Sequence, residues 1–575
     1  MVTVPLVSDP AAAPARTGPP PWWFRAARRV RTTARALPLS GWALGCTVLG
    51  CGLWLWWSPQ APDLAAQVAR AQVAGRAPWA VWWTGWFAGL SLPTYSVLSP
   101  QLMASIGVTT SGVFAVVTGS LGTARLAADA RRPRTGAAAF ALAQLADLFA
   151  GRVTFALGFA AGAWALVALR SRRGVAGAGL ALLTFLLSPL AGLFLGMVTT
   201  AVALCRPRLR RVALAGATVL LGVAVTLAWL VPDPGTMPFS VTAAEPAVLA
   251  AVVVAVLCPP APVRIGALLA LAATLAFLVV PGAVGVNITR LSWIVAVPVV
   301  LACASPPPWL AQRLEQALPG RPGTPSSRAT AAVVVGLAAA GVAVAPVSDL
   351  VVQVRLGSDR SADPAFYAPL NQALASRGVT PGARVEVVDP ANHWSAAYVT
   401  ADLARGWERQ ADLARNPIFY GREPLTEESY HAWLQRLAVG WVAVPAVPLD
   451  GAAQAEASLV ASGPAYLERE WASADWTLFR VRDAAALADV GRVVAVTTDS
   501  VTLAVDGPGA VHLSLRWSPD LTLLDPASGR PAAGCVEQDG AWVRVRLPSA
   551  GTVRLTARVD LPRRLGWTAA CTVRP

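Results

Sequence analysis

Residues 40–89 read SGWALGCTVLGCGLWLWWSPQAPDLAAQVARAQVAGRAPWAVWWTGWFAG, an uncharged apolar segment followed by a lone carboxylate and a cluster of tryptophans. An apolar segment of this kind predicts a membrane helix. A helical run, PDLAAQVARAQVAG, then follows, with Pro62 at its first position, Asp63 at its second and Gly75 at its end. We expect this run to lie along the membrane surface, just outside the first span.

The tryptophan cluster after this run has two interpretations. Trp79, Trp82, Trp83 and Trp86 suit a membrane interface, because an indole has an apolar body and a polar N–H. With Asp63 as a helix-capping residue, the stretch would then be an ordinary aromatic belt. In the alternative interpretation, the acid and the tryptophans belong to a site at the outer face of the membrane.

The chain is too apolar for a soluble protein. Of its 575 residues, 55% are hydrophobic and 14% are charged, whereas soluble proteins carry about 25% charged residues. Every basic residue is arginine, and the excess is confined to residues 1–346, with a formal charge of +18 against −3 for residues 347–575. Cytoplasmic loops explain this better than nucleic-acid binding, which would group arginines on a soluble domain. We expect a polytopic α-helical membrane protein that binds no nucleic acid.

Recurring apolar segments predict about eleven membrane spans. Several are shorter than the roughly 20 residues that cross a bilayer comfortably. The pairs 136–150/153–169 and 175–187/190–205 are therefore either two short spans each or one broken helix each. The segments are 40–57, 106–124, 136–150, 153–169, 175–187, 190–205, 211–231, 245–258, 263–280, 291–304 and 329–347.

Arginine placement predicts the topology. With the N-terminus inside, inner loops hold 21 arginines and outer loops hold only Arg70, Arg76, Arg152 and Arg290, a strong positive-inside bias. Residues 1–38 are then a disordered basic cytoplasmic head before an uncleaved signal anchor, and residues 39–347 form the transmembrane domain. An odd number of spans places the tail outside, so we expect a multi-pass plasma-membrane protein with an extracytoplasmic C-terminal part.

The tail divides into two predicted units. Residues 348–485 form a mixed α/β unit, with strands in ARVEVVDP and VGWVAVPAVPLD and a helix in TEESYHAWLQRLA that Thr426 caps. Residues 486–575 alternate apolar and polar residues between Gly/Pro turns, which predicts a small β-sandwich. Cys535 and Cys571 are the only cysteines of the tail. Outside the cytoplasm they are candidates for a disulfide, and two unpaired thiols are the alternative.

Polar side chains gather at the predicted outer ends of the spans. Ionisable groups at membrane depth are costly and often functional. Arginine binds phosphate in a bidentate way, and a carboxylate within ~3 Å of an acceptor hydroxyl can take its proton. The pattern indicates a site for a lipid-linked sugar phosphate. Its members are Asp147 and Arg152 around one outer turn, Asp233 and Glu245 around a second loop, and Asn287 and Arg290 in a third, with Arg152, Arg290 and Asn287 as candidates for binding the donor phosphate.

Several short motifs resemble the polytopic glycosyltransferases of the GT-C superfamily. The resemblance is greatest to the actinobacterial branch known as the 6-pyruvoyl-tetrahydropterin-synthase-related membrane domain, with the YfhO-like proteins nearby. It covers the membrane half and, more loosely, the first tail unit. The motifs are the early Asp63, WFAG (residues 86–89), Tyr95, LSP (98–100), NITRL (287–291) and ARGWERQ (404–410).

This resemblance implies roles for individual residues. Asp63 matches the first-loop acid, which in GT-C enzymes is the catalytic base or helps to hold a metal, so a divalent cation is a candidate cofactor. Many GT-C enzymes carry a second acid in this loop, but here Asp63 has no acidic neighbour. The candidates for that second acid are Asp147, Asp233 and Glu245. The candidates for interfacial or acceptor contacts are Trp82, Trp83, Trp86 and Tyr95.

The sequence as a whole favours a membrane glycosyltransferase. It would move a sugar from a polyprenyl-phosphate donor to an extracytoplasmic envelope glycan or lipid. The alternatives are a transporter or flippase of lipid-linked precursors, which would carry polar groups near the midplane of broken helices, and a non-catalytic envelope assembly protein. A further cluster in the tail is either a sugar-binding surface or part of a folded α/β core: His393, Trp394, Tyr398, Trp407, Glu408 and Arg409.

Overall fold

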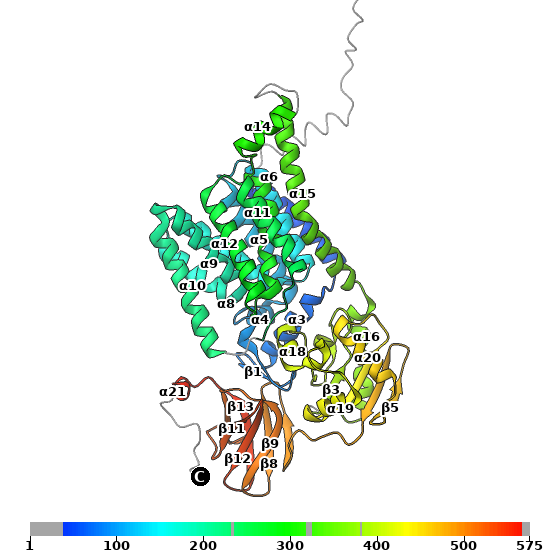
Figure 1. The fold of residues 1–575 in the computed structure, drawn as a ribbon. Helices are drawn as coiled ribbons and strands as arrows, with labels where there is room; N and C mark the ends of the chain where they lie inside the picture. The colour runs from blue at the N-terminus through cyan, green and yellow to red at the C-terminus, as the bar shows by residue number, and fades with distance from the viewer. Residues whose placement is uncertain (1–37, 232–234, 318–324, 380–381, 566–575) are drawn as a thin grey trace, which may run out of the picture.

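The computed structural model describes residues 38–231, 235–317, 325–379 and 382–565. A helical bundle forms the larger part of the molecule, and a tail with all but two of the described strands lies beyond one end of it (Figure 1). We call the end of the bundle next to this part the tail-side end, and the opposite end the distal end. Nearly all of the predicted cytoplasmic head, residues 1–37, lies outside the described residues.

A helix occupies each of the apolar segments. By length and composition, six described helices can cross a membrane, or seven if α4 (Ser99–Ile106) and α5 form one span bent by 113°. The chain is thus a mostly helical, polytopic membrane protein, and eleven spans stay a prediction. The helices are α2 (Leu39–Trp57), α5 (Val108–Ala127), α6 (Pro133–Phe149), α7 (Val153–Arg170), α8 (Gly174–Leu187), α9 (Pro189–Cys205), α10 (Arg210–Leu230), α11 (Val241–Leu257), α12 (Ala261–Val279), α13 (Thr289–Cys303) and α15 (Pro325–Leu356).

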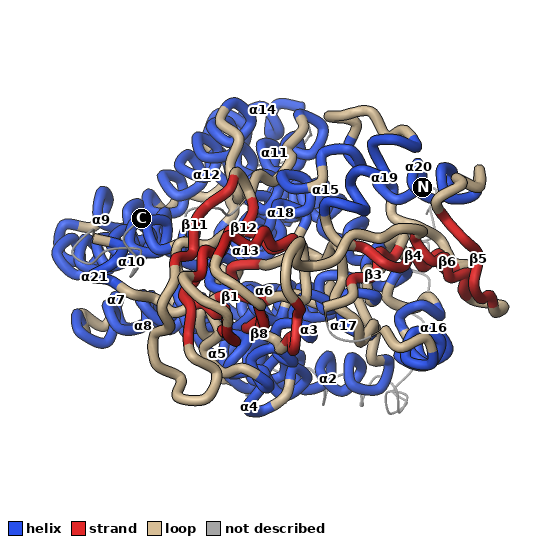
Figure 2. Tube along the Cα trace, turned by 90° about the horizontal axis from the view of Figure 1, so that it is seen from below, coloured by secondary structure: helices blue, strands red, loops and turns tan. Residues whose placement is uncertain are grey.

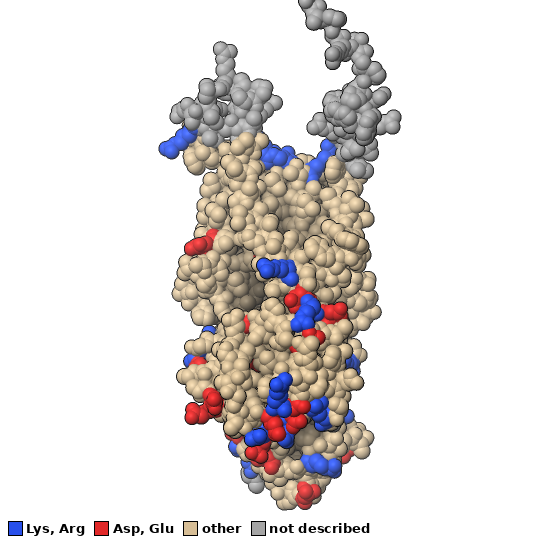
Figure 3. All heavy atoms as spheres, turned by 90° about the vertical axis from the view of Figure 1, so that its right-hand side faces the viewer, with Lys and Arg blue, Asp and Glu red and all other residues tan. Residues whose placement is uncertain are grey.

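The side of the bundle is an apolar surface. In Figure 3 the upper half of the visible face carries few charges, whereas mixed charges gather on the lower half, over the tail. Large apolar side chains point outward from the bundle helices; Leu49 of α2 is 77% exposed and Leu221 of α10 is 66% exposed. An apolar band of this extent is the surface that faces lipid.

Small residues let the helices approach closely. A Cβ added to Gly158 of α7 would lie 2.6 Å from the Cβ of Ser188 and 2.8 Å from that of Ala191, at the start of α9. A Cβ on Gly136 of α6 would lie 2.7 Å from the Cβ of Ala302 in α13. Close approach at glycine and alanine is how helices associate in lipid, where burial of apolar surface gives little driving force.

The first helix after α2 is a buried element. Ten of the 15 residues of α3 (Pro62–Arg76) are buried, because the bundle covers one side of the helix and the tail covers another. The main-chain N–H of Gln60, just before α3, donates to the carbonyl of Gly357 at the start of the tail, at 3.0 Å. The expectation that this run lies along the membrane surface is therefore wrong.

The tryptophan cluster is also built into the protein. Trp82 lies in β1 (Trp82–Trp83), which pairs with β2 (Leu90–Ser91); it is 1% exposed and packs in the core of the β-sandwich. Trp86 is 1% exposed in the core shared by bundle and tail, while Trp79 is 63% exposed. The aromatic-belt interpretation is therefore wrong for Trp82 and Trp86, whose side chains are buried in protein cores. The sequence does not distinguish the two cases, because an indole that suits a membrane interface also suits a protein core.

The first unit of the tail has a four-stranded sheet in the order β3-β4-β6-β5. Its strands are β3 (Arg384–Val387), β4 (Val439–Pro445), β5 (Leu467–Ala472) and β6 (Trp476–Val481), with β3 parallel to β4 and the other pairs antiparallel. Thr426 caps α19 in a capping box with Ser429, which confirms the predicted helix start. The helices around the sheet are α16 (Pro364–Ser376), α17 (Ser395–Tyr398), α18 (Arg409–Arg415), α19 (Glu427–Arg436) and α20 (Gln454–Ala461).

The last part of the chain forms two antiparallel sheets, ordered β10-β13-β8-β7 and β11-β12-β9. These strands lie beyond the tail-side end of the bundle (Figure 1), and in the view from below they are grouped apart from β3–β6 of the first tail unit (Figure 2). Cys535 is buried and disulfide-bonded; Cys571 lies outside the described residues, so its pairing stays a prediction. The strands are β7 (Arg492–Val496), β8 (Ser500–Val505), β9 (Gly509–Arg516), β10 (Leu521–Leu524), β11 (Cys535–Asp539), β12 (Trp542–Leu547) and β13 (Gly551–Ala557).

Candidate functional site

Asp63 is held in place by a clamp between α3 and the turn from α6 to α7. The side-chain amide of Gln67, one helical turn after Asp63, donates to the carbonyl oxygens of Asp63 and Gly151, at 2.7 and 2.5 Å. Its amide oxygen accepts from the main-chain N–H of Thr154 at 2.7 Å. These hydrogen bonds hold Asp63 beside Arg152, which lies in the turn from α6 to α7.

The turn itself depends on glycine at position 151. Gly151 has φ +77°, and an added Cβ would lie 3.0 Å from the main-chain nitrogen of Leu64 and 3.1 Å from the Cβ of Ala61. A side chain here would be strained and would push α3 away. Glycine therefore sets the close approach that brings Asp63 to Arg152.

Two arginines share one oxygen of the Asp63 carboxylate. Oδ2 of Asp63 lies 3.2 Å from Nε of Arg152 and 2.8 Å from Nη2 of Arg290 in α13. Arg152 also contacts Oδ2 of Asp349 in α15 at 2.6 Å and Oδ1 of Asp147 in α6 at 3.7 Å. We call these five residues the ion cluster; it joins α3, α6, the α6–α7 turn, α13 and α15 at the tail-side end of the bundle.

Accessibility differs within the ion cluster. The side chains of Asp63 and Arg290 are 24% and 20% exposed, whereas those of Arg152 and Asp147 are each 7% exposed. Arg152 is also stacked over Trp293, with its guanidinium carbon 4.9 Å from the ring centroid. Arg290 is thus the more accessible cation, and Arg152 is the more firmly held one.

The ion pairs keep Asp63 ionised. Burial by itself would raise the pKa of this carboxyl, but the charges of Arg290 and Arg152 and their hydrogen bonds lower the pKa below its ordinary value. Asp63 is therefore a carboxylate at neutral pH. It is also a weak base for as long as both arginines stay in contact with it.

A second ion pair joins the first loop to the tail. Arg70 of α3 contacts Glu408, and their side chains are 1% and 6% exposed. The guanidinium carbon of Arg70 also lies 4.4 Å from the ring centroid of Tyr95 and 5.2 Å from that of Trp86. Arg70 was not among the predicted site residues, because the sequence of a helix in a predicted outer loop does not show that its arginine is buried.

Tyr95 lies between the two groups of charges. Burial and the negative charge of Asp63 raise the pKa of its phenol to about 12, against the lowering effect of Arg70 and Arg290. The hydroxyl therefore stays protonated at neutral pH and remains a hydrogen-bond donor. Trp83, half-buried, packs on Trp86 with the ring centroids 4.5 Å apart.

The aromatic cluster of the tail is a docking surface for the first loop. The indole N–H of Trp407 donates to the carbonyl of Pro62 at 2.9 Å, and that of Trp394 donates to the carbonyl of Gln60 at 2.7 Å. His393 stacks on Trp407 with the ring centroids 3.5 Å apart. Trp394 and Trp407 therefore bind the first residue of α3 and the segment just before it, so these two indoles do not form an open sugar-binding surface.

The remaining predicted residues are placed as follows. Asn287 is half-buried in the 3-10 helix η3 (Gly285–Ile288), directly before α13 and Arg290. Glu245 is exposed on α11 and has no ion pair among the described residues. Asp233 lies outside the described residues. Of the three candidates for a second acid, only Asp147 lies in the ion cluster among the described residues. The cluster also contains Asp349, which the sequence analysis missed.

A metal ion does not fit this donor set. Within the described residues, no three His, Cys, Asp or Glu side chains are grouped so that they could hold one. The carboxylates of Asp63, Asp147 and Asp349 all face Arg152, which takes the place that a cation would need. The site is an arginine–carboxylate site.

Comparisons with known proteins give remote similarity. No protein-family model and no curated protein sequence matches the chain. The chain is similar to the arabinofuranosyltransferase AftD from Mycobacteria at 14% identity and a TM-score of 0.43, over 90% of this chain and 57% of that one. It is also similar to the archaeal oligosaccharyltransferase AglB from Archaeoglobus fulgidus, at 11% identity and a TM-score of 0.29, over 70% of this chain and 69% of that one. The chain thus aligns with less than two thirds of AftD.

Proposed function

We propose that the chain is a membrane glycosyltransferase that moves a sugar from a polyprenyl-phosphate donor to an acceptor outside the cytoplasm. The observation that supports this most is the shared carboxylate oxygen of Asp63, held by Arg152 and Arg290 from two separate elements. One group that can take a proton and two groups that can bind a phosphate therefore meet at one place.

The donor phosphate would compete with Asp63 for Arg290. A phosphate offers more oxygens and more charge than one carboxylate, and arginine binds it in a bidentate way. Arg290 is the partner free to turn, since Arg152 is also held by Asp349 at 2.6 Å. Binding of the donor would thus release Asp63 from one of its two cations and raise its pKa towards the ordinary value.

The released carboxylate would act as general base. The proton of the acceptor hydroxyl passes to Asp63, the acceptor oxygen bonds to the anomeric carbon, and the bond from that carbon to the phosphate oxygen breaks. Negative charge grows on the leaving phosphate, where Arg290 stabilises it more strongly in the transition state than in the ground state. Tyr95, protonated at neutral pH, would donate a hydrogen bond to the acceptor or the sugar.

The docked tail would shield the reaction from water. Trp407 and Trp394 bind the main chain just before Asp63, so the first tail unit covers the start of α3. Excluding water strengthens the electrostatic interactions of the site and disfavours hydrolysis of the donor. The acceptor would enter between this cover and the membrane surface.

The test is transfer by the purified full chain, wild type against Asp63→Asn, with a panel of radiolabelled polyprenyl-phosphate sugars. We expect transfer to fall by roughly 10²- to 10⁴-fold in the variant, which is what a general base contributes. Glu245→Gln is the matched control, because Glu245 is exposed and outside the ion cluster. Equal transfer by wild type and Asp63→Asn would exclude Asp63 as the base.

A further inference from the structure

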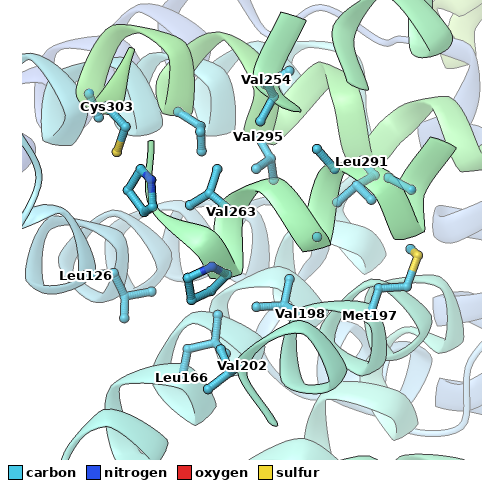
Figure 4. Close-up of a pocket in the computed structure, with 18 of the residues that line it drawn as sticks. Leu126, Leu166, Met197, Val198, Val202, Val254, Val263, Leu291, Val295 and Cys303 are labelled. Carbon is cyan, nitrogen blue, oxygen red and sulfur yellow. The ribbon is translucent and has the colours of Figure 1, made fainter. Parts of the chain in front are cut away.

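A large apolar cavity lies inside the bundle, apart from the ion cluster. Its volume is about 1050 Å³ and its walls come mainly from α5, α7, α9, α11, α12 and α13. Figure 4 shows apolar side chains such as Leu166, Val202, Val263 and Val295 around it. Binding sites for drug-sized ligands are about 300–1,000 Å³, so this cavity has room for the chains of a lipid.

The charged groups on the cavity wall all lie at its distal end. They are Asp129, Arg170, Arg172, Arg206 and Arg208. Asp129 is paired with Arg170 at 2.9 Å. The other three arginines are exposed and have no ion pair among the described residues. The distal mouth therefore offers three guanidinium groups that no acid of the described chain neutralises.

The tail-side end of the cavity has the opposite character. There the wall is made of residues such as Ile288, Leu291 and Ser292, and neither Arg290 nor Arg152 lines it. A molecule that fills the cavity would thus meet cations at one end and an uncharged, mainly apolar wall at the other. An anionic lipid has this distribution of charge, with a phosphate head and long apolar chains.

We propose that the cavity binds one anionic phospholipid. Its phosphate lies against Arg172, Arg206 and Arg208, and its acyl chains run between α7, α9, α12 and α13 towards the tail-side end. On the predicted topology the distal end faces the cytoplasm, so the lipid comes from the inner leaflet, where basic pockets between helices bind anionic head groups. This site is separate from the ion cluster and does not depend on the proposed transferase activity.

The competing occupant is the chain of a polyprenyl phosphate whose phosphate lies at Arg290. The absence of Arg290 from the cavity wall argues against it. A second explanation is that the distal arginines serve only to fix the topology. Topology alone does not require that arginines line an apolar cavity of lipid size, whereas a lipid site does.

The test measures lipid binding to the purified full chain in neutral detergent, by native mass spectrometry and by thermal stabilisation. The probes are phosphatidylglycerol and phosphatidylcholine with the same acyl chains. One variant carries Arg172→Gln, Arg206→Gln and Arg208→Gln. Its matched control carries Arg131→Gln, Arg210→Gln and Arg211→Gln, three exposed arginines at the same end that do not line the cavity.

We expect wild type and the control to prefer phosphatidylglycerol, and the cavity variant to bind it at least about tenfold more weakly. Gly266→Phe tests the apolar part without changing charge: Gly266 lines the cavity, and its added Cβ meets only Ala201 at 3.9 Å. It should reduce binding of both lipids. Equal binding by the two triple variants, or no effect of Gly266→Phe, would overturn the proposal.

Arg290→Gln separates the two occupants. The proposal expects this variant to bind phosphatidylglycerol as wild type does. If binding falls with Arg290→Gln, or if an added polyprenyl phosphate displaces the phospholipid in wild type but not in Arg290→Gln, the cavity holds the donor chain and the proposal is wrong.

Discussion

At Asp63, a single carboxylate oxygen is the meeting point of two guanidinium groups. The pair Asp63–Arg290 is part-exposed, whereas Arg152 is held by further contacts with Asp349 and Trp293. This asymmetry gives the two arginines different tasks. Arg290 is suited to bind an incoming phosphate, and Arg152 is suited to keep Asp63 in position.

The pairing of Asp63 makes stability depend on pH. Its pKa in the folded protein is lower than the value of about 3.9 in an unfolded chain. The stabilisation is therefore complete above that value and is lost as pH falls through the lowered pKa. Thermal unfolding in detergent between about pH 6 and pH 2 should show wild type losing stability more steeply than Asp63→Asn. Parallel curves would mean that Asp63 is not paired in the folded protein.

The buried pair Arg70–Glu408 should contribute a large part of the free energy that holds the tail against the first loop. Glu408→Gln leaves the charge of Arg70 buried and unmatched, which typically costs about 3–5 kcal/mol of unfolding free energy. The double variant Arg70→Met/Glu408→Gln removes both charges and should recover part of this loss. The measurement is thermal or denaturant unfolding of wild type, Arg70→Met, Glu408→Gln and the double variant. A double variant as unstable as the sum of the singles would show that the two residues act independently.

At the scale of elements, α3 is positioned by main-chain geometry as much as by side chains. Gln67 ties α3 to the α6–α7 turn, and Gly151 allows the two to touch. The sequence revealed the acid at the start of α3 and the arginine in the turn. It did not reveal the clamp, because a glutamine inside a helix has the same pattern whether it is exposed or bonded to residues far along the chain.

Gly151→Ala should separate Asp63 from Arg152. The positive φ and the contact with Leu64 strain any side chain, at a cost of about 1–3 kcal/mol. Gly174→Ala is the control, since its added Cβ meets nothing within 4 Å. We expect transfer activity to fall with Gly151→Ala by more than the loss of folded protein explains, and to be unchanged with Gly174→Ala. An unchanged rate in Gly151→Ala would show that the turn does not set the site.

Some residues of the site could be predicted from the sequence and others could not. The cluster of Asp63, Arg152 and Arg290 was predictable from polar residues at one end of the apolar segments. Asp349 was not, since it sits near the end of a span and its partner Arg152 lies 197 positions away. Trp82 is a candidate for interfacial or acceptor contacts from sequence alone, because the sequence does not show that the sandwich packs around it.

For the whole molecule, the first loop, residues 58–98, connects the helical bundle with both units of the tail. Thr84 bonds the main chain of the β-sandwich at Thr497 and Thr498, and the main-chain N–H of Leu403 in the first tail unit donates to Gly85 at 2.8 Å. Trp407 and Trp394 hold the start of α3 from the other side. Bundle, α/β unit and sandwich therefore meet around the residues that present Asp63.

The competition between Asp63 and a phosphate for Arg290 is the central claim, and binding of a sugar-free polyprenyl phosphate tests it most directly. The measurement is its dissociation constant for wild type, Asp63→Asn and Arg290→Gln in the same detergent. We expect Asp63→Asn to bind roughly tenfold more tightly, because Arg290 is no longer occupied, and Arg290→Gln to bind more weakly. Unchanged or weaker binding by Asp63→Asn would contradict the account.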